Sequence, residues 1–238
     1  MGTKAKYKRV ILKLSGEALG GETKAGIHFK TLTEICESIK KCYDIGVEIG
    51  VVVGGGNFWC GRSIENMDKA RADHIGMLAT AMNAIATANV LEGMGCDVRV
   101  QTAIAMQELA EPYVRQKAMS HFSKGRIVVF GCGTGNPFFS TDSAAALRAA
   151  ELDADILLKA TMVDGVYDKD PLKFDDAVKF ETMKAKDILI NGLRVLDGAA
   201  AAICIENNIP LLVFDLKRTD NIYDAVMGKK IGTIVSNQ

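Results

Sequence analysis

The sequence has no excess of either charge, because 29 Lys and Arg residues balance 29 Asp and Glu residues. A chain without a strongly basic balance has no overall electrostatic attraction for nucleic acid. Any anion that this protein binds must therefore be held by a local site, not by the charge of the whole molecule.

Metal and redox motifs are also missing. None of the six cysteines forms a Cys-x-x-Cys pair, so neither a zinc site nor a redox motif is predicted. The three histidines, His28, His74 and His121, show no metal-ligand spacing and accompany no recognisable Ser or Cys nucleophile. We expect the cysteines to be free thiols in a reducing cytoplasm.

Signals for export and for membranes are not predicted either. Residues 1–6 lack the apolar core of a secretory leader, and Lys6 breaks the myristoylation pattern. On sequence grounds we expect no apolar stretch long enough to cross a bilayer. These absences predict a cytoplasmic protein with neither a nucleic-acid nor a membrane partner.

The composition is that of a folded α/β protein. Hydrophobic residues make up 48% of the 238 residues, which is enough for a sizeable core and too many for a disordered chain. This length allows one large α/β domain or two closely joined lobes. The sequence contains no internal repeat and no low-complexity segment.

Three consecutive glycines mark the most informative stretch. The apolar run Val51–Val53 predicts a strand buried on both faces, and it ends directly at Gly54, Gly55 and Gly56. Glycine lets the backbone come close to a ligand, and free backbone N–H groups at the end of a parallel strand favour phosphate. A tight turn packed under a helix explains these glycines equally well when they are considered alone.

Strands and helices are predicted to alternate along the chain, which favours a mainly parallel sheet covered on both faces. The segments 163–167 and 178–182 bracket a charged loop and suggest a hairpin. We expect Thr141 or Asp142 to cap the helix that follows them. The expected strands cover 10–14, 51–53, 98–100, 127–130, 156–158, 211–214 and 233–235, and the expected helices cover 32–43, 67–94, 113–122, 144–152, 187–190, 199–206 and 221–227.

Three predicted strands end in loops rich in Gly, Ser or Thr, at Ser15–Gly16, Gly54–Asn57 and Gly131–Asn136. In a parallel sheet these ends meet at one edge, so the loops are expected to hold two phosphorylated ligands, or one with several phosphates. Lys13 and Lys159 lie in otherwise apolar strands, and a buried ammonium needs an anion beside it. The Gly-x-Gly-x-x-Gly and Gly-x-x-x-x-Gly-Lys-Ser/Thr patterns do not occur, so a Walker-type ATPase is not predicted.

Longer motifs resemble one known family closely. Lys13-Leu14-Ser15-Gly16-Glu17, Asp73-His74-Ile75-Gly76-Met77-Leu78-Ala79-Thr80 and Gly133-Thr134-Gly135-Asn136-Pro137-Phe138-Phe139 resemble the bacterial uridylate kinases of the amino acid kinase superfamily. The stretch Lys159 to Tyr167 also matches, and the resemblance runs from the first strand to the C-terminus. The Gly-Thr-Gly-Asn-Pro-Phe-Phe run is specific to the uridylate branch.

The resemblance implies a three-layer α/β/α sandwich with a mainly parallel central sheet, in a single domain over residues 1–238. It implies transfer of a phosphoryl group from ATP–Mg²⁺ to UMP, with UMP features mainly in the N-terminal half and ATP features mainly in the C-terminal half. No direct metal ligand is implied. It also implies a cytoplasmic homohexamer that GTP activates and UTP inhibits.

The resemblance further assigns roles position by position. The residues it implies for ATP are Lys13, Leu14, Ser15, Gly16, Gly56, Thr161, Tyr167 and Asp170. Those for UMP are Gly55, Asp73, Thr134, Gly135, Asn136, Pro137, Phe138, Phe139, Ser140 and Thr141. Those for GTP activation are Gly21, Glu22, Thr23, Lys24, Ala25 and Gly26.

The expected chemistry depends on charge. UMP is a phosphate monoester that is largely dianionic near neutral pH, with a second pKa of about 6, so its attack on ATP needs no general base. Catalysis then consists of positioning and of neutralising charge on the transferring group. We expect Lys13 and Lys159 to do this, with Asp142 orienting a lysine or helping to hold the metal through water.

One position departs from the family pattern. The family places a phosphate-binding arginine three residues after the Asn of Gly-Gly-Gly-Asn, and this chain has Cys60 there. A thiol cannot replace a planar cationic fork. Our hypothesis is that Arg62, just past Gly61, takes over this role, although a solvated loop position explains Arg62 equally well.

Two other functions stay open at the level of the sequence. A sibling enzyme of the acetylglutamate or carbamate kinase type would phosphorylate a carboxylate or carbamate, without needing the Gly-Thr-Gly-Asn-Pro run. A regulatory protein that senses UMP or UTP, with catalysis weakened at Cys60, is the second alternative. The retained Lys13 and Lys159 argue against the regulatory function.

Overall fold

Apolar strands alternate with helices along the chain, as the sequence predicts. The computed structural model describes residues 5–59, 67–169, 171, 173–190 and 195–237. The strands are β1 (Arg9–Leu14), β2 (Glu48–Val53), β3 (Val98–Thr102), β4 (Glu111–Pro112), β5 (Ile127–Gly131), β6 (Ile156–Thr161), β7 (Val166–Tyr167), β8 (Lys179–Phe180), β9 (Thr182–Lys184), β10 (Leu211–Asp215) and β11 (Thr233–Ser236). The helices are α1 (Gly16–Leu19), α2 (Phe29–Asp44), α3 (Lys69–Gly93), α4 (Arg115–Ser123), α5 (Thr141–Glu151), α6 (Ala185–Ile190), α7 (Gly198–Glu206) and α8 (Asn221–Val226), with a 3-10 turn at Gly21–Thr23.

The central sheet has nine strands in the described residues, in the order β4-β3-β5-β2-β1-β6-β10-β11-β9. Every neighbouring pair of strands in this sheet is parallel except β10–β11, which is antiparallel. The carboxyl ends of β1, β2, β5, β6 and β10 therefore lie along one edge. This edge carries the loops that the sequence analysis singled out.

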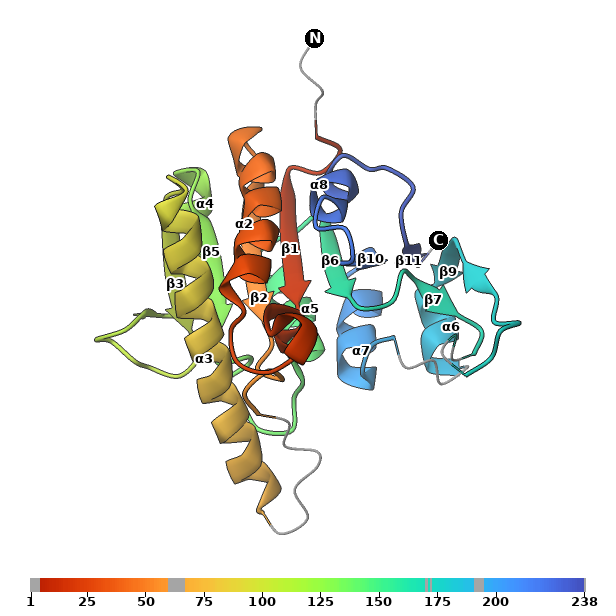
Figure 1. Ribbon diagram of the computed structural model, residues 1–238, viewed down its shortest axis with the longest axis horizontal. Helices are drawn as coiled ribbons and strands as arrows, with labels where there is room; N and C mark the ends of the chain where they lie inside the picture. Colours follow the sequence, from red (N-terminus) through yellow and green to blue (C-terminus); the bar gives the residue numbers. More distant parts are fainter. Residues whose placement is uncertain (1–4, 60–66, 170, 172, 191–194, 238) are drawn as a thin grey trace.

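Helices cover both faces of this sheet, so the three-layer α/β/α fold is confirmed. On one face α2, α3 and α8 pack over side chains such as Leu12, Val51 and Leu158. On the other face α4, α5 and α7 pack over Ile11, Val128 and Leu157. Figure 1 shows α2, α3 and α8 in front of the sheet, and the first turns of α3 project beyond the carboxyl ends of the strands.

The segment after β6 forms the hairpin that the sequence suggested. Strands β7 and β8 pair antiparallel in a separate two-stranded sheet, with Val166 opposite Phe180. The expected strand 178–182 is in fact divided, because β9 leaves this hairpin and joins β11 at the edge of the main sheet. Two-residue and three-residue strands of this kind carry too little periodicity to be predicted.

Two local predictions are wrong. The loop expected at Ser15–Glu17 is the start of α1, where the Ser15 side chain accepts a hydrogen bond from the Ala18 N–H. The cap of α5 is Ser140 and not Thr141 or Asp142. Ser140 has extended backbone angles and its hydroxyl accepts from the N–H groups of Asp142 and Ser143, whereas Thr141 is already helical.

Helix α3 corrects the expectation that no apolar stretch could span a bilayer. Its 25 residues are long and apolar enough to do so by length and composition, the one such helix in the described part of the chain. Half of its most apolar window is nevertheless buried inside the protein, where Ala84, Ala88 and Leu91 face the sheet. Helix α3 is therefore a core helix of the α/β sandwich.

Phe122 tests the packing of the α4 layer. It is 1% exposed and lies in the core on the α5 side of the sheet. We expect Phe122→Ala to lower the free energy of unfolding by about 3–5 kcal/mol, because it removes a large apolar side chain and leaves a cavity. Denaturant unfolding measures this. Phe29→Ala is the matched control, since Phe29 is 59% exposed, and an equal loss in both variants would contradict the placement of Phe122.

Candidate active site

Two lysines lie side by side where β1 and β6 approach their carboxyl ends. Lys13 and Lys159 are direct partners in the parallel register of the two strands. The strand alternation puts both side chains on the face that also carries Ile11 and Leu157, which is the face that α5 covers. The sequence placed both lysines in apolar strands, and the structure brings their ammonium groups together under the N-terminus of α5.

Asp142, in the first turn of α5, lies between these ammonium groups. Its Oδ1 is 2.9 Å from Lys13 Nζ and its Oδ2 is 2.5 Å from Lys159 Nζ. The three side chains are only 12 to 15% exposed. Lys159 Nζ also donates to the carbonyl of Val195 at 2.5 Å. Two cations and one anion leave this cluster with a net positive charge, as a phosphate site requires.

Burial and charge compete in this cluster. Burial alone would raise the pKa of Asp142, but the ammonium groups of Lys13 and Lys159 outweigh it and hold that pKa below its ordinary value. Burial lowers the pKa of Lys159 below its ordinary value; attraction to Asp142 opposes this shift, and repulsion from Lys13 adds to it. Asp142 is thus the group that compensates the positive charge of the two buried lysines.

The glycine loop after β2 packs tightly against its neighbours. A Cβ on Gly16 would lie 2.4 Å from the Gly56 nitrogen, so the first and second loops are in contact. A Cβ on Gly55 would lie 2.8 Å from the Gly76 carbonyl of α3. Only Gly56 is open, with Glu17 as its sole neighbour at 3.5 Å or more. Gly55 is therefore a glycine because it lies in a turn packed against α3, whereas Gly56 leaves room for a ligand to approach the backbone.

Two buried asparagines hold this loop in place. Asn83 of α3 donates to the Gly54 carbonyl at 2.7 Å and to Asn57 Oδ1 at 2.7 Å. Asn57 in turn donates to the Gly26 carbonyl at 2.6 Å, and its own carbonyl accepts from the Gly26 N–H. The segment Gly21–Gly26 is therefore bonded directly to the glycine loop.

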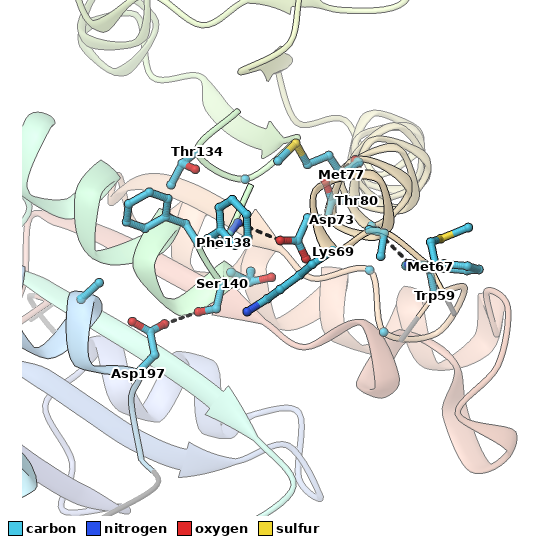
Figure 2. Close-up of a pocket in the computed structure, with 18 of the residues that line it drawn as sticks. Trp59, Met67, Lys69, Asp73, Met77, Thr80, Thr134, Phe138, Ser140 and Asp197 are labelled. Carbon is cyan, nitrogen blue, oxygen red and sulfur yellow. Dashed lines mark hydrogen bonds between the residues drawn. The ribbon is translucent and has the colours of Figure 1, made fainter. Parts of the chain in front are cut away.

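A cavity of about 1000 Å³ opens beside these loops (Figure 2). It lies between the N-terminal turns of α3, the glycine loop, the loop after β5 and the start of α7. Its lining residues include Gly55, Gly56, Trp59, Lys69, Asp73, Thr80, Gly133, Thr134, Phe138, Phe139, Ser140, Thr141 and Asp197.

The loop after β5 is bonded to α3 at two points. The Cys132 N–H donates to Thr80 Oγ1 at 2.7 Å, and the Phe138 N–H donates to Asp73 Oδ2 at 2.7 Å. Phe138 has a φ of 73°, which a bulky residue rarely adopts, and its ring is 67% exposed. The contact with Asp73 therefore holds Phe138 in a strained conformation at the mouth of the cavity.

The structure brings most of the predicted residues together but divides them into two groups. Gly55, Gly56, Asp73, Thr134, Phe138, Phe139, Ser140 and Thr141 line the cavity, whereas Gly135, Asn136 and Pro137 do not. Lys13, Leu14, Ser15, Gly16, Asp142 and Lys159 lie next to the cavity, at the ends of β1 and β6 and the start of α5, and Thr161 and Tyr167 lie farther along towards β7. Cys60, Arg62 and Asp170 lie outside the described residues.

Asp197 is a site residue that the sequence analysis missed. It accepts hydrogen bonds from Ser140 and, at 2.8 Å, from Ser143 of α5, and it caps α7 by accepting from the Ala200 N–H at 2.8 Å. It also lines the cavity. Asp197 stands just before Gly198 and the alanine run 199–202. An Asp at this place is an N-cap signal that could have identified it.

Comparison with known proteins agrees with this geometry. Residues 8–215 match the amino acid kinase family. The UMP kinase of Bacillus anthracis is 35% identical, with 98% of this chain and 97% of that chain covered and a TM-score of 0.94. The UMP kinase of Ureaplasma parvum is 36% identical, with 97% of this chain and 99% of that chain covered and a TM-score of 0.91. The uridylate kinase of Archaeoglobus fulgidus is 29% identical, with 95% of this chain and 99% of that chain covered and a TM-score of 0.73.

Asp142→Asn tests the charge balance of the lysine cluster. In the folded wild type the low pKa of Asp142 stabilises the protein above the unfolded pKa, and this contribution is lost as the pH falls through the folded value. Without the carboxylate, the pKa of Lys159 falls further below its unfolded value. The folded state then binds fewer protons than the unfolded state, so stability rises with pH from 7 toward about 10.

We expect Asp142→Asn to lose about 3–5 kcal/mol of unfolding free energy at pH 7, because it leaves buried charges uncompensated. The deficit should shrink as the pH approaches 10, and urea unfolding at several pH values measures it. Asp44→Asn, which removes the exposed partner of Lys40, is the control and should change little. A deficit independent of pH would contradict the assignment.

Proposed function

The chain belongs to the amino acid kinase family, and from that membership we propose that it is a uridylate kinase, a phosphotransferase that converts ATP and UMP to ADP and UDP. The observation that carries this proposal is the Lys13–Asp142–Lys159 cluster beside a cavity lined by the Gly133–Thr141 loop. The similarity of this chain to UMP kinases over nearly its whole length supports the same function.

The two groups of residues divide the reaction between them. UMP occupies the cavity, with Asp73 at its ribose hydroxyls and the loop from Thr134 to Thr141 around its base and phosphate. The ATP phosphates lie over Lys13, Ser15, Gly16 and Gly56, and Thr161, Tyr167 and Asp170 hold the adenosine. The two nucleotides then meet at the N-terminus of α5.

The chemistry is charge neutralisation in a fixed geometry. Two phosphate groups repel each other, and the paired ammonium groups of Lys13 and Lys159 stabilise the charge on the transferring group. Asp142 compensates the charge of both lysines and holds them in position. The UMP phosphate is itself the nucleophile, so no side chain needs to remove a proton from it.

Mg²⁺ is expected to enter with ATP. Both oxygens of Asp142 already face ammonium groups, and the described residues contain no group of three His, Cys, Asp or Glu side chains that could hold a metal. This fits a cation that keeps several waters and binds mainly to substrate phosphates. When bound, Mg²⁺ would neutralise charge on the ATP phosphates.

Regulation and assembly follow the family expectation. We propose a cytoplasmic homohexamer in pyrimidine nucleotide biosynthesis, activated by GTP and inhibited by UTP. The hydrogen bonds between Gly26 and Asn57 support a regulatory role for residues 21–26, because they connect this segment to the glycine loop. A nucleotide that moved the segment would therefore act on the loop beside the ATP phosphates.

ADP release tests the proposed function directly. The purified protein with ATP and Mg²⁺ should release ADP when UMP is present, release less with CMP, release none without an acceptor, and slow down when UTP is added. ADP release with a carboxylate acceptor but not with UMP would favour the acetylglutamate or carbamate kinase type. Binding of UMP without any turnover would favour the regulatory protein.

Lys13→Ala tests the role of the cluster in the chemical step. We expect kcat to fall by about a hundredfold or more, because a charge that stabilises the transition state is lost, while the Kd for UMP changes by less than about threefold. Steady-state kinetics and UMP titration measure the two effects. Lys40→Ala, at an exposed lysine on α2, is the control; an unaltered kcat in Lys13→Ala would remove Lys13 from the mechanism.

Arg62→Ala tests whether Arg62 replaces the missing arginine. If Arg62 binds phosphate in place of the residue at Cys60, kcat/KM should fall by about tenfold, the effect of losing one charge-assisted hydrogen bond. An unchanged kcat/KM would mean that Arg62 is a solvated loop residue. Cys60→Arg provides the converse test, because it restores the family residue and should raise kcat/KM.

A further inference from the structure

Lys69 is a cation of the cavity to which the sequence analysis gave no role. It is the first residue of α3 and lines the cavity one helical turn before Asp73. Its side chain extends across the cavity toward Ser140, and its ammonium group lies 5.4 Å from the centre of the Phe138 ring (Figure 2). In the described part of the chain, no carboxylate lies within ion-pair distance of Lys69.

The charge of the cavity makes this position significant. Among the described residues, the charged side chains in its lining are Lys69, Asp73 and Asp197. Two carboxylates would repel a dianionic phosphate, and Asp197 is only partly compensated by the donors Ser140, Ser143 and Ala200 N–H. Lys69 is the cation in the described lining that can offset this repulsion.

The chain also lacks the phosphate-binding arginine that the family pattern places at position 60. The family arginine is replaced by Cys60, and the Lys13–Lys159 pair lies deeper, where Asp142 already binds both ammonium groups. Among the described residues Lys69 instead keeps its ammonium group free of any acid and directed toward Ser140, at the N-terminus of α5, where backbone N–H groups and the helix dipole also favour an anion.

From this arrangement we infer that Lys69 binds the phosphate of the acceptor nucleotide. The inference rests on the proposed function and adds a residue to it. The ammonium group lies over the Phe138 ring, and Asp73 accepts a hydrogen bond from the Phe138 N–H on the same face of α3. Binding of the nucleotide exchanges the ring for a phosphate oxygen, which is a stronger partner for an ammonium group.

The test compares UMP with uridine, which lacks the phosphate. We expect Lys69→Gln to raise the Kd for UMP by about tenfold, measured by titration calorimetry, and to leave the inhibition constant of uridine, measured as a competitor of UMP, unchanged. Lys69→Arg keeps the charge and should retain most of the UMP affinity. Thermal unfolding of Lys69→Gln should match the wild type, since the residue is exposed.

Arg71→Gln is the matched control, because it removes an exposed cation from the same turn of α3 that does not line the cavity. It should leave both constants unchanged. An unaltered UMP affinity in Lys69→Gln, or an equal loss of affinity for UMP and for uridine, would overturn the inference. The proposed function would still stand as long as the wild type converts UMP to UDP. A wild type that forms no UDP from UMP would overturn both.

Discussion

The structure of this site depends on one electrostatic constraint, the placement of two ammonium groups side by side in a region that water barely reaches. Lys13 and Lys159 are register partners on adjacent strands, so their repulsion cannot be relieved by moving apart. Asp142 compensates them because α5 begins directly above both. The arrangement keeps one positive charge in excess, fixed before any ligand arrives, which is what charge stabilisation of phosphoryl transfer requires.

The rest of the site is built outward from this cluster through backbone contacts. Helix α1 packs so closely on the glycine loop that Gly16 tolerates no side chain, and Asn83 fixes that loop from α3. Asp197 joins the start of α5 to the start of α7 through Ser140 and Ser143. Each loop is therefore held from at least two sides, and the positions of the ligand-facing groups are set by rigid elements.

The cavity and the lysine cluster occupy neighbouring parts of the site. Asp73 and Thr134, which we propose bind the ribose and base of UMP, line the cavity, whereas the ammonium groups that we propose act in catalysis lie just beyond it. Phe138 lines the cavity in a conformation with positive φ, with its N–H bonded to Asp73 and its ring beneath the Lys69 ammonium group. Lys69 and Asp73 of α3 thus both contact the same loop residue.

Local patterns in the sequence were enough to predict the longer strands and helices, the mainly parallel sheet and the glycine-rich loops after β2 and β5, because apolar periodicity and Gly-rich strand ends are local signals. They missed the short strand β4, the division of segment 178–182 into β8 and β9, and the helix α1 that follows β1. The sequence also identified Lys13 and Lys159, since a charge in an apolar strand is conspicuous. The folded arrangement was needed to show that these lysines share Asp142, that Gly55 is a packing residue while Gly56 is open, and that Asp197 and Lys69 line the cavity. Those facts depend on the register between strands and on how α3, α5 and α7 pack, which are contacts between residues far apart in the chain that no local pattern encodes.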